Sequence, residues 1–320
     1  MPKSFVFILN PISFVGNQPV EVIPRHVFQK ADAEQREIIR GHLLNLSPQK
    51  WSALLRYEFE IRESRKDESH TEYIHEKLEP EDWRYWVITF EGTNSEIQDL
   101  ESASSLLNND LEFGFTVLGD GPEFPPEMQG QYNGLMWPRS ILTYFMDIPS
   151  YEAVTGISSK DIEEIGTIYT RIKALSREHE AIRRALQLFD SLKSLPRRSE
   201  MVVLGLFSVM ECLLTHRPDP KDPTDSLTRQ IKAKMPLLSK RFDWKLDYGA
   251  FFEQADEDTV WARLYDYRSR IAHGESTTLS RNLRILRSND KIIEFLRETA
   301  KLLLLLALRE PVLLIDLKKC

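Results

Sequence analysis

The sequence predicts an α+β domain followed by an all-α helical bundle. Short segments rich in β-branched and aromatic residues, each ending in turn-forming residues, recur up to about residue 150. From Ser158 onward the apolar residues recur at steps of three and four, which is the helical period. The charge changes at the same place, because residues 1–150 hold 13 Lys and Arg against 24 Asp and Glu, whereas residues 151–320 hold 29 against 25. We therefore expect one domain over residues 1–150 and another over residues 151–320.

The composition is typical of a globular protein, with 42% hydrophobic and 28% charged residues. The two cysteines, Cys212 and Cys320, are far apart and form no CxxC pair. This argues against a disulfide framework or a cysteine zinc site and predicts a cytoplasmic protein. The apolar run Leu302–Leu308 is far shorter than the roughly 20 residues that a membrane span needs. We expect it to be part of a buried helix, with no membrane partner.

The N-terminal domain is predicted to contain strands around a helix. The helix covers Ala31–Leu46, where the apolar residues have helical spacing. Gly119–Gly134 is a loop by its composition. The predicted strands are Ser4–Leu9, Tyr85–Gly92, Leu111–Gly119 and Ser140–Asp147.

A long helix is predicted over residues 158–195, with Ser158 or Ser159 as its N-cap and acidic residues in its first turn. Its apolar seam must be buried, either in a bundle within the chain or against a second subunit, and the intrachain bundle is the favoured alternative. The seam consists of Ile165, Ile168, Ile172, Leu175, Ile182, Leu186 and Phe189, with His179 as its polar member.

Four further segments complete a bundle of about five helices. The first is apolar nearly all round, which predicts a central helix, and it contains a single inner acid, Glu211. Asp225 or Ser226 is the expected N-cap of the second, and Gly274 is the expected C-terminal glycine of the third. The segments are Glu200–Leu214, Ser226–Leu238, Asp256–Gly274 and Arg284–Glu310.

Several kinds of site are not indicated by the sequence. It contains neither GxxxxGK[ST] nor GxGxxG, so no phosphate loop is predicted. His70 and His75 stand among glutamates, but their spacing is not that of HExxH. We interpret them as surface residues and expect no metal and no cofactor.

One cluster indicates chemistry: Arg268, Ser269, Arg270 and His273 precede Gly274. Ser269 and His273 are four residues apart, so they share a helix face and the hydroxyl can orient the imidazole. Arg268 and His273 are five apart and diverge by about 140° in a regular helix. They converge on one ligand only if the helix end is irregular or a neighbouring helix guides the arginine. The alternative is a plain helix tail, whose basic residues oppose the negative end of the helix dipole.

The segment YDYRSRIAHG, Tyr265–Gly274, resembles the Arg-x4–6-His motif of the HEPN superfamily. It is most similar to the ApeA-like and Abi-like families, in which a tyrosine, RS and HG recur. FSVMECLLT followed by SLTRQIKAKMPLL resembles the earlier family helix with its buried acid and the arginine-bearing helix after it. The resemblance covers residues 200–310. Many HEPN ribonucleases carry Asn, Asp or His directly after the arginine, whereas this chain has Ser269, as in the ApeA-like branch.

The resemblance implies a metal-independent endoribonuclease with Arg268 and His273 as catalytic residues. An RNA 2′-hydroxyl attacks the adjacent phosphate, and the step needs a base, an acid and positive charge for the phosphorane. Histidine serves as base or acid, and arginine donates in a fork that matches phosphate oxygens. DNA lacks the 2′-hydroxyl, so this chemistry selects RNA, with tRNA as a candidate target.

The neighbouring residues are expected to assist this pair. Glu211 needs a partner because an unpaired buried charge is costly; an arginine of the motif helix is the favoured partner and Arg229 the competing one. Tyrosines ahead of the motif can stack on a base, although at least one of them is expected in the core. The expected supporting residues are Ser269, Glu211 and Tyr267, and the expected RNA-binding residues are Arg270, Tyr265 and Arg229. For Arg270 a salt bridge is the alternative to an RNA backbone contact.

One motif supplies one histidine, whereas concerted acid and base catalysis is easier with two. A two-fold homodimer would bring both motifs into one cleft, with the seam of residues 158–195 as one contributor to the interface. The resemblance further implies a toxin-like ribonuclease in antiphage abortive infection. The acidic residues 1–150 are then expected to sense a phage-derived trigger or mask the basic cleft. The alternative function is a non-catalytic HEPN domain that binds a nucleotide or a partner protein.

Overall fold

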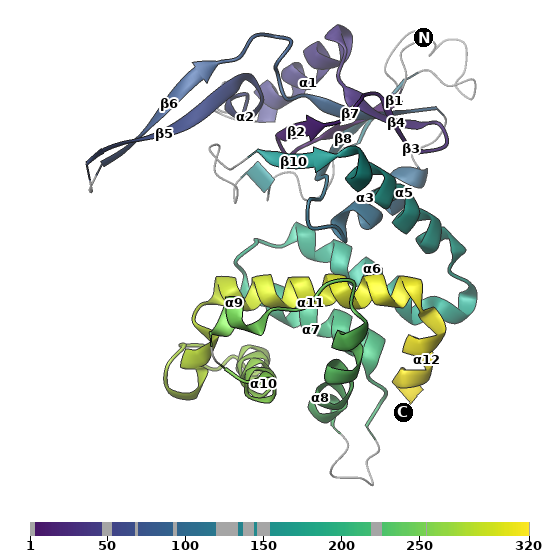
Figure 1. Cartoon of the computed structure of the whole chain (residues 1–320), viewed down its shortest axis with the longest axis vertical. Coiled ribbons are helices and arrows are strands. Elements are labelled where there is room, and N and C mark those ends of the chain that lie inside the picture. Colours follow the sequence, from purple (N-terminus) through teal and green to yellow (C-terminus); the bar gives the residue numbers. More distant parts are fainter. Residues whose placement is uncertain are drawn as a thin grey trace. The chain divides into compact units, whose positions relative to one another are not determined.

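The computed structural model describes residues 4–46, 53–67, 70–91, 95–119, 134–136, 144–145, 154–218, 226–253 and 255–319. The chain divides into two compact units, Met1–Tyr169 and Thr170–Cys320. Figure 1 shows a sheet region followed by a mostly helical region. The predicted order of a mixed α+β part and then a helical part is therefore confirmed. The division falls within helix α5 (Ser159–Ala174).

The first unit is built on a six-stranded sheet with the order β3-β4-β7-β1-β8-β9, in which each neighbouring pair is antiparallel. β1 is buried along its whole length because β7 and β8 flank it. The strands are β1 (Ser4–Ile8), β3 (Val20–Ile23), β4 (His26–Lys30), β7 (Trp86–Phe90), β8 (Phe113–Leu118) and β9 (Gly134–Met136). The predictions for β1, β7 and β8 are confirmed.

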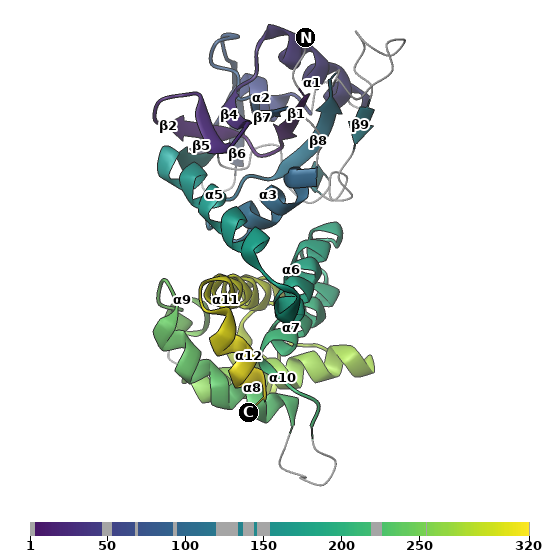
Figure 2. The ribbon, with the colours of Figure 1, turned by 90° about the vertical axis from the view of Figure 1, so that its right-hand side faces the viewer.

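Among the described residues, two smaller ribbons and several helices complete this unit. β2 (Ile12–Val15) pairs in parallel with β10 (Thr155–Ser158). The charged segment that includes His75 forms a hairpin of β5 (Phe59–Asp67) and β6 (His70–Lys77). In Figures 1 and 2, α1 lies on one side of the sheet and α3 and α5 on the other. The helices are α1 (Ala33–Leu46), which confirms the predicted helix, α2 (Leu55–Glu58), α3 (Ser95–Ser105) and the first part of α5.

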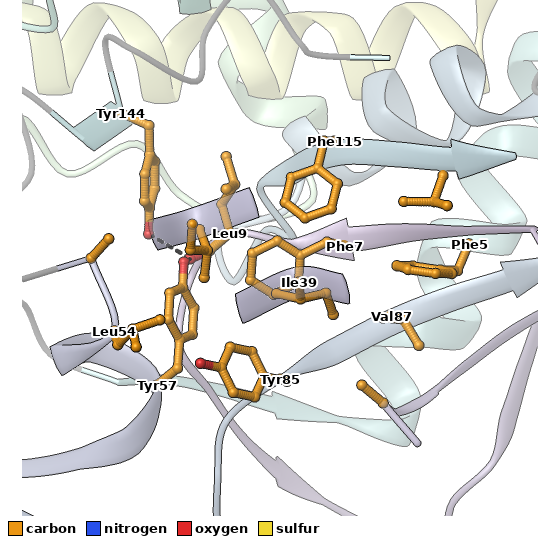
Figure 3. Close-up of a cluster of buried hydrophobic side chains, with 14 residues drawn as sticks. Phe5, Phe7, Leu9, Ile39, Leu54, Tyr57, Tyr85, Val87, Phe115 and Tyr144 are labelled. Carbon is orange, nitrogen blue, oxygen red and sulfur yellow. Dashed lines mark hydrogen bonds between the residues drawn. The ribbon is translucent and has the colours of Figure 1, made fainter. Parts of the chain in front are cut away.

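An aromatic cluster fills the space between the sheet and α1 (Figure 3). Because side chains alternate along a strand, Phe5 and Phe7 of β1 point to this face. The hydroxyl groups of Tyr57 and Tyr144 both donate to the Leu9 carbonyl, at 2.6 and 3.1 Å. A carbonyl oxygen has two lone pairs, so both buried phenols are satisfied by one backbone group.

The predicted strand Ser140–Asp147 falls mostly outside the described residues. Its two described residues, Tyr144 and Phe145, are helical, so the strand prediction is wrong there. Tyr144 is placed by its bond to Leu9, a tertiary contact that the local pattern does not show. Of the predicted loop Gly119–Gly134, only the two end residues are described.

The second unit is organised around α7, which contacts α6, α8, α10, α11 and α12. Figures 1 and 2 show α7 beside α6 and α11. The prediction of a central helix is confirmed. The helices are α6 (Glu180–Ser191), α7 (Glu200–Leu214), α8 (Leu227–Leu238), α9 (Tyr248–Phe252), α10 (Glu257–His273), α11 (Asn289–Arg309) and α12 (Pro311–Lys319). The 3-10 turns are η2 (Arg177–His179), η3 (Leu192–Ser194), η4 (Ser239–Arg241) and η5 (Arg281–Leu286).

Two local predictions in this unit are confirmed. Ser226 is the N-cap of α8, and its hydroxyl accepts a bond from the Arg229 backbone N–H at 3.3 Å. The run Leu302–Leu308 lies in α11 and is buried throughout. Within the described parts of the chain, no helix has the length and apolar character needed to cross a membrane.

The predicted long helix over residues 158–195 is wrong, because it is interrupted between α5 and α6. Ser158 is the residue directly before α5, and its backbone N–H donates to Asp161 Oδ2 in the first turn at 2.7 Å. The chain leaves the helix after Ala174, and the backbone N–H of Ser176 then donates to His179 Nδ1 at 3.0 Å. A serine whose side chain and N–H pair with the residue three positions later starts a new helix. His179 is therefore a capping residue and not a polar seam member.

The apolar seam is used within the chain. Its apolar members from Ile165 to Phe189 are each at most 8% exposed. The favoured intrachain burial of the seam is therefore confirmed, and it leaves these residues little surface to offer to a second subunit. The homodimer itself stays a prediction.

Candidate active site

Helix α10 carries the Arg268–His273 cluster and is capped by the residues that flank it, Asp256 and Gly274. Asp256 Oδ1 accepts the Thr259 backbone N–H at 2.9 Å, and the hydrogen bonds from Thr259 lower the pKa of Asp256. At the other end Gly274 adopts a left-handed conformation with φ 67°. This conformation suits glycine, which lacks a Cβ.

The last turn of α10 is closed by the backbone. The N–H of Glu275 donates to the Arg270 carbonyl at 2.8 Å, and the N–H of Gly274 to the Ile271 carbonyl at 3.1 Å, which is a Schellman motif. Basic side chains are therefore not needed to satisfy these carbonyls. The helix remains regular through His273, so the irregular end that would turn Arg268 towards His273 is not present.

Ser269 and His273 lie on the exposed face of α10. Their four-residue separation in a continuous helix puts them one turn apart, as predicted. Arg268 lies about 140° from His273 around the same helix. The structure thus brings Ser269 and His273 onto one face and directs Arg268 elsewhere.

Arg268 turns towards α7. One of its terminal nitrogens, Nη2, is 3.3 Å from Glu211 Oε1. The predicted pairing of Glu211 with an arginine of the motif helix is confirmed, and the competing candidate Arg229 is exposed on α8. Burial raises the pKa of Glu211, while the nearby Arg268 charge opposes that rise. The pair fixes the arginine against the central helix.

The surroundings of this ion pair are incompletely hydrogen-bonded. Glu211 Oε1, Arg268 Nε and the Tyr265 hydroxyl are all buried, and none has a hydrogen-bond partner among the described residues. The Tyr265 ring packs against Phe207 at a centroid distance of 4.8 Å and is 8% exposed. The predicted stacking of Tyr265 on an RNA base does not fit this placement. Burial, with the Glu211 charge as a second cause, raises the pKa of Tyr265, so the phenol stays protonated.

Tyr267 links α10 to Glu200 and Asn289 through its hydroxyl group. Its hydroxyl lies 3.1 Å from Asn289 Oδ1 and 3.4 Å from Glu200 Oε1. Thr277, just after the helix, donates to the same Glu200 oxygen at 2.5 Å. Burial and the Glu200 carboxylate raise the pKa of Tyr267 to about 12. This network ties the segment that follows His273 to the starts of α7 and α11.

Three members of that network, Glu200, Thr277 and Asn289, are not indicated by the sequence pattern. They lie far apart along the chain and meet only through tertiary packing. The one available signal is Glu200 at the start of a helix, where an acid is expected for the dipole alone.

Arg270 makes a local ion pair. Its Nε and Nη2 atoms lie 3.2 and 3.3 Å from the two carboxylate oxygens of Asp266, one turn earlier. Such partly exposed pairs contribute only about 0.3–0.5 kcal/mol. A phosphate can therefore replace Asp266 at little cost, which keeps Arg270 available for the predicted RNA contact.

Among the residues that the structure describes, no three metal-ligating side chains gather at one place. Comparisons with protein-family models, with curated proteins and with solved structures give no match. The relation to the HEPN superfamily therefore remains a prediction that rests on the residues of α7, α8 and α10.

Proposed function

We propose that this protein is a metal-independent endoribonuclease of the HEPN type. The observation that carries the proposal is the end of α10. There an exposed histidine, His273, follows Ser269 by one turn, and the preceding arginine, Arg268, is anchored by a carboxylate from the central helix. A solvent-facing imidazole and a fixed guanidinium are the groups that RNA transesterification requires.

The reaction follows from these groups. One imidazole accepts the proton of the ribose 2′-hydroxyl as its oxygen attacks the neighbouring phosphorus. The bond from phosphorus to the 5′-oxygen then breaks, and that oxygen takes up a proton. The products are a 2′,3′-cyclic phosphate and a 5′-hydroxyl end. Arg268 donates to the phosphate oxygens, where negative charge accumulates in the transition state.

Two copies of the chain complete the site in this proposal. Arg268 and His273 diverge within one chain, so one phosphate does not meet both of them there. A two-fold arrangement of two α10 ends would place Arg268 of one copy opposite His273 of the other and would supply two histidines. The homodimer is thus part of the mechanism.

The biological role follows from the resemblance alone. We propose that the enzyme acts in antiphage abortive infection and cleaves cellular RNA such as tRNA. The acidic N-terminal unit is the proposed receiver of a phage-derived trigger, since its charge disfavours RNA binding.

Expression of matched variants tests the proposal. Wild type, His273→Ala and Arg268→Lys are produced in cells with and without phage infection, and the integrity of total RNA is measured. We expect RNA breakage with wild type and intact RNA with both variants. Arg268→Lys is preferred to alanine because it keeps a cation beside Glu211. If wild type leaves RNA intact in every condition, the nuclease proposal is wrong.

One observation favours the alternative of a non-catalytic binding domain. Arg268 is already paired with Glu211 and directed away from His273. A domain that only clamps a nucleotide or a partner protein does not need the two groups to converge. This alternative predicts that wild type binds nucleotide or protein but leaves RNA uncut.

A further inference from the structure

The positive charge of the C-terminal half is concentrated in one segment. Residues 263–287 hold six arginines and only two acids, Asp266 and Glu275. This excess of four equals the whole excess of residues 151–320, which hold 29 basic and 25 acidic residues. The segment runs from the middle of α10 to Arg287, directly after η5, so it includes the candidate active site.

The η5 turn has one apolar and one basic ridge. In a 3-10 helix, side chains three residues apart lie above one another. Leu283 and Leu286 are fully buried, and η5 packs against α10. Arg281 and Arg284 of η5 have the same spacing and are exposed, and Arg287, directly after η5, is exposed too. The leucine ridge therefore anchors η5, and the arginine ridge faces solvent.

Two arginines of this ridge have no counter-ion in the described parts of the chain. Arg287 pairs with Glu253, whereas no ion pair or side-chain hydrogen bond to a described residue involves Arg281 or Arg284. Arg281, at the start of η5, and Arg287, directly after it, both have a positive φ, at 51° and 64°, which strains the backbone of a residue with a Cβ. The backbone thus bears strain at both ends of the ridge.

The same side of α10 adds further arginines. The loop into η5 passes beside Tyr267, because Tyr267 and Thr277 bond to the same Glu200 oxygen. Around the helix, Arg263 and Arg270 lie about 40° and 60° from Tyr267. His273 follows about 60° beyond Arg270 in the same sense. Arg263 and Arg270 therefore lie on α10 between Tyr267, beside which the loop into η5 passes, and the exposed face that carries His273.

We infer that Arg281 and Arg284 of η5, with Arg263 and Arg270 of α10, form a track for the phosphate backbone of single-stranded RNA that leads to His273. This inference rests on the proposed function for its choice of RNA. Arginine forks match phosphate oxygens and give the track no sequence preference. The track and the cleavage reaction are separate properties and can fail separately.

Salt dependence of binding tests the track directly. The full chain with His273→Ala, which is expected not to cut, is titrated with a labelled single-stranded RNA at about 50–200 mM salt. Arg281→Gln/Arg284→Gln in that background should bind more weakly and flatten the slope of log affinity against log salt by about 1.4, which is about 0.7 for each phosphate contact. The matched control is Arg177→Gln/Arg184→Gln, which removes two exposed arginines from the same unit. The control should keep the parent slope.

Two further measurements, with a DNA probe and with a lysine variant, complete the test. With single-stranded DNA of the same sequence, the glutamine variant should show the same decrease in the salt slope of binding, because the contacts are to phosphates. Arg281→Lys/Arg284→Lys should restore the slope, which rules out a folding defect. An unchanged slope in the glutamine variant, or the same loss in the control, would overturn the track even if wild type cleaves RNA. Loss of slope without cleavage by wild type would support the track and reject the nuclease proposal.

Discussion

At the scale of single residues, Arg268 and His273 differ in how the fold holds them. Arg268 is one-third exposed and rests against Glu211, whose side chain is 16% exposed. His273 is exposed at the last position of its helix. A change at His273 therefore tests chemistry with little effect on folding. A change at Arg268 also removes the partner of a buried carboxylate.

The Glu211 carboxylate gives stability a pH dependence of known sign. Its pKa is raised in the folded chain, so the folded state holds a proton to higher pH than the unfolded state. Stability then falls as pH rises through that interval. We expect wild type to gain stability relative to Glu211→Gln as pH is lowered from neutral towards about 4.3, the ordinary pKa of glutamate. Denaturant titrations of both proteins at several pH values measure this difference. A difference that is constant, or that shrinks as pH falls, would contradict it.

At the scale of elements, features with local signals were predictable from the sequence. Ser226 and Gly274 mark helix ends because a cap needs only a few neighbouring residues. The break between α5 and α6 was not, because Ile172, Leu175 and His179 continue the three-and-four spacing across it. There the cap formed by Ser176 overrides the period.

The strands β3 and β4 of the six-stranded sheet were not predictable from local signals. β3 and β4 are short and partly exposed, so they lack the continuous apolar pattern that identifies β1. β4 pairs with β7 and β3 pairs with β4, and the local sequence does not encode either register. The same limit applies to the site. The Glu211–Arg268 pair was predictable, because an acid in an apolar helix needs a partner to offset the free-energy cost of a buried charge, but the Glu200–Thr277 contact was not.

The close approach of α5 to β3 makes a second prediction. A Cβ at Gly166 would collide with the Val22 carbonyl, whereas a Cβ at Gly41 in α1 has no atom within 4 Å. We expect Gly166→Ala to lower the free energy of unfolding by about 1–3 kcal/mol. Gly41→Ala, the matched helical control, should raise it by up to about 1 kcal/mol. Chemical denaturation of the two variants measures both effects, and equal effects would refute the close packing.

At the scale of the whole molecule, the charge pattern was readable from the sequence and its arrangement was not. Composition shows an acidic first part and a mildly basic second part. Only the fold separates the arginines of α10 and η5 by their surroundings, since Arg268 turns towards Glu211 and Arg287 pairs with Glu253, whereas Arg281 and Arg284 are exposed.

The divergence of Arg268 and His273 predicts complementation between chains. In the proposed dimer, a site takes Arg268 from one copy and His273 from the other. A heterodimer of Arg268→Lys and His273→Ala chains then has one site with both groups intact. Mixing the two inactive variants should restore up to about a quarter of wild-type cleavage, because half of the random dimers are mixed and each has one such site. Activity no greater than that of the separate variants would contradict a site that needs only Arg268 from one copy and His273 from the other.

The most direct test of the central claim is cleavage of RNA by the purified full chain with EDTA present. Wild type and His273→Ala are incubated with RNA, with and without an extract of phage-infected cells to supply a trigger. We predict cleavage by wild type that leaves 2′,3′-cyclic phosphate and 5′-hydroxyl ends, and a rate at least about 100-fold lower for His273→Ala. Intact RNA in every wild-type reaction, or equal cleavage by the two proteins, would contradict the account.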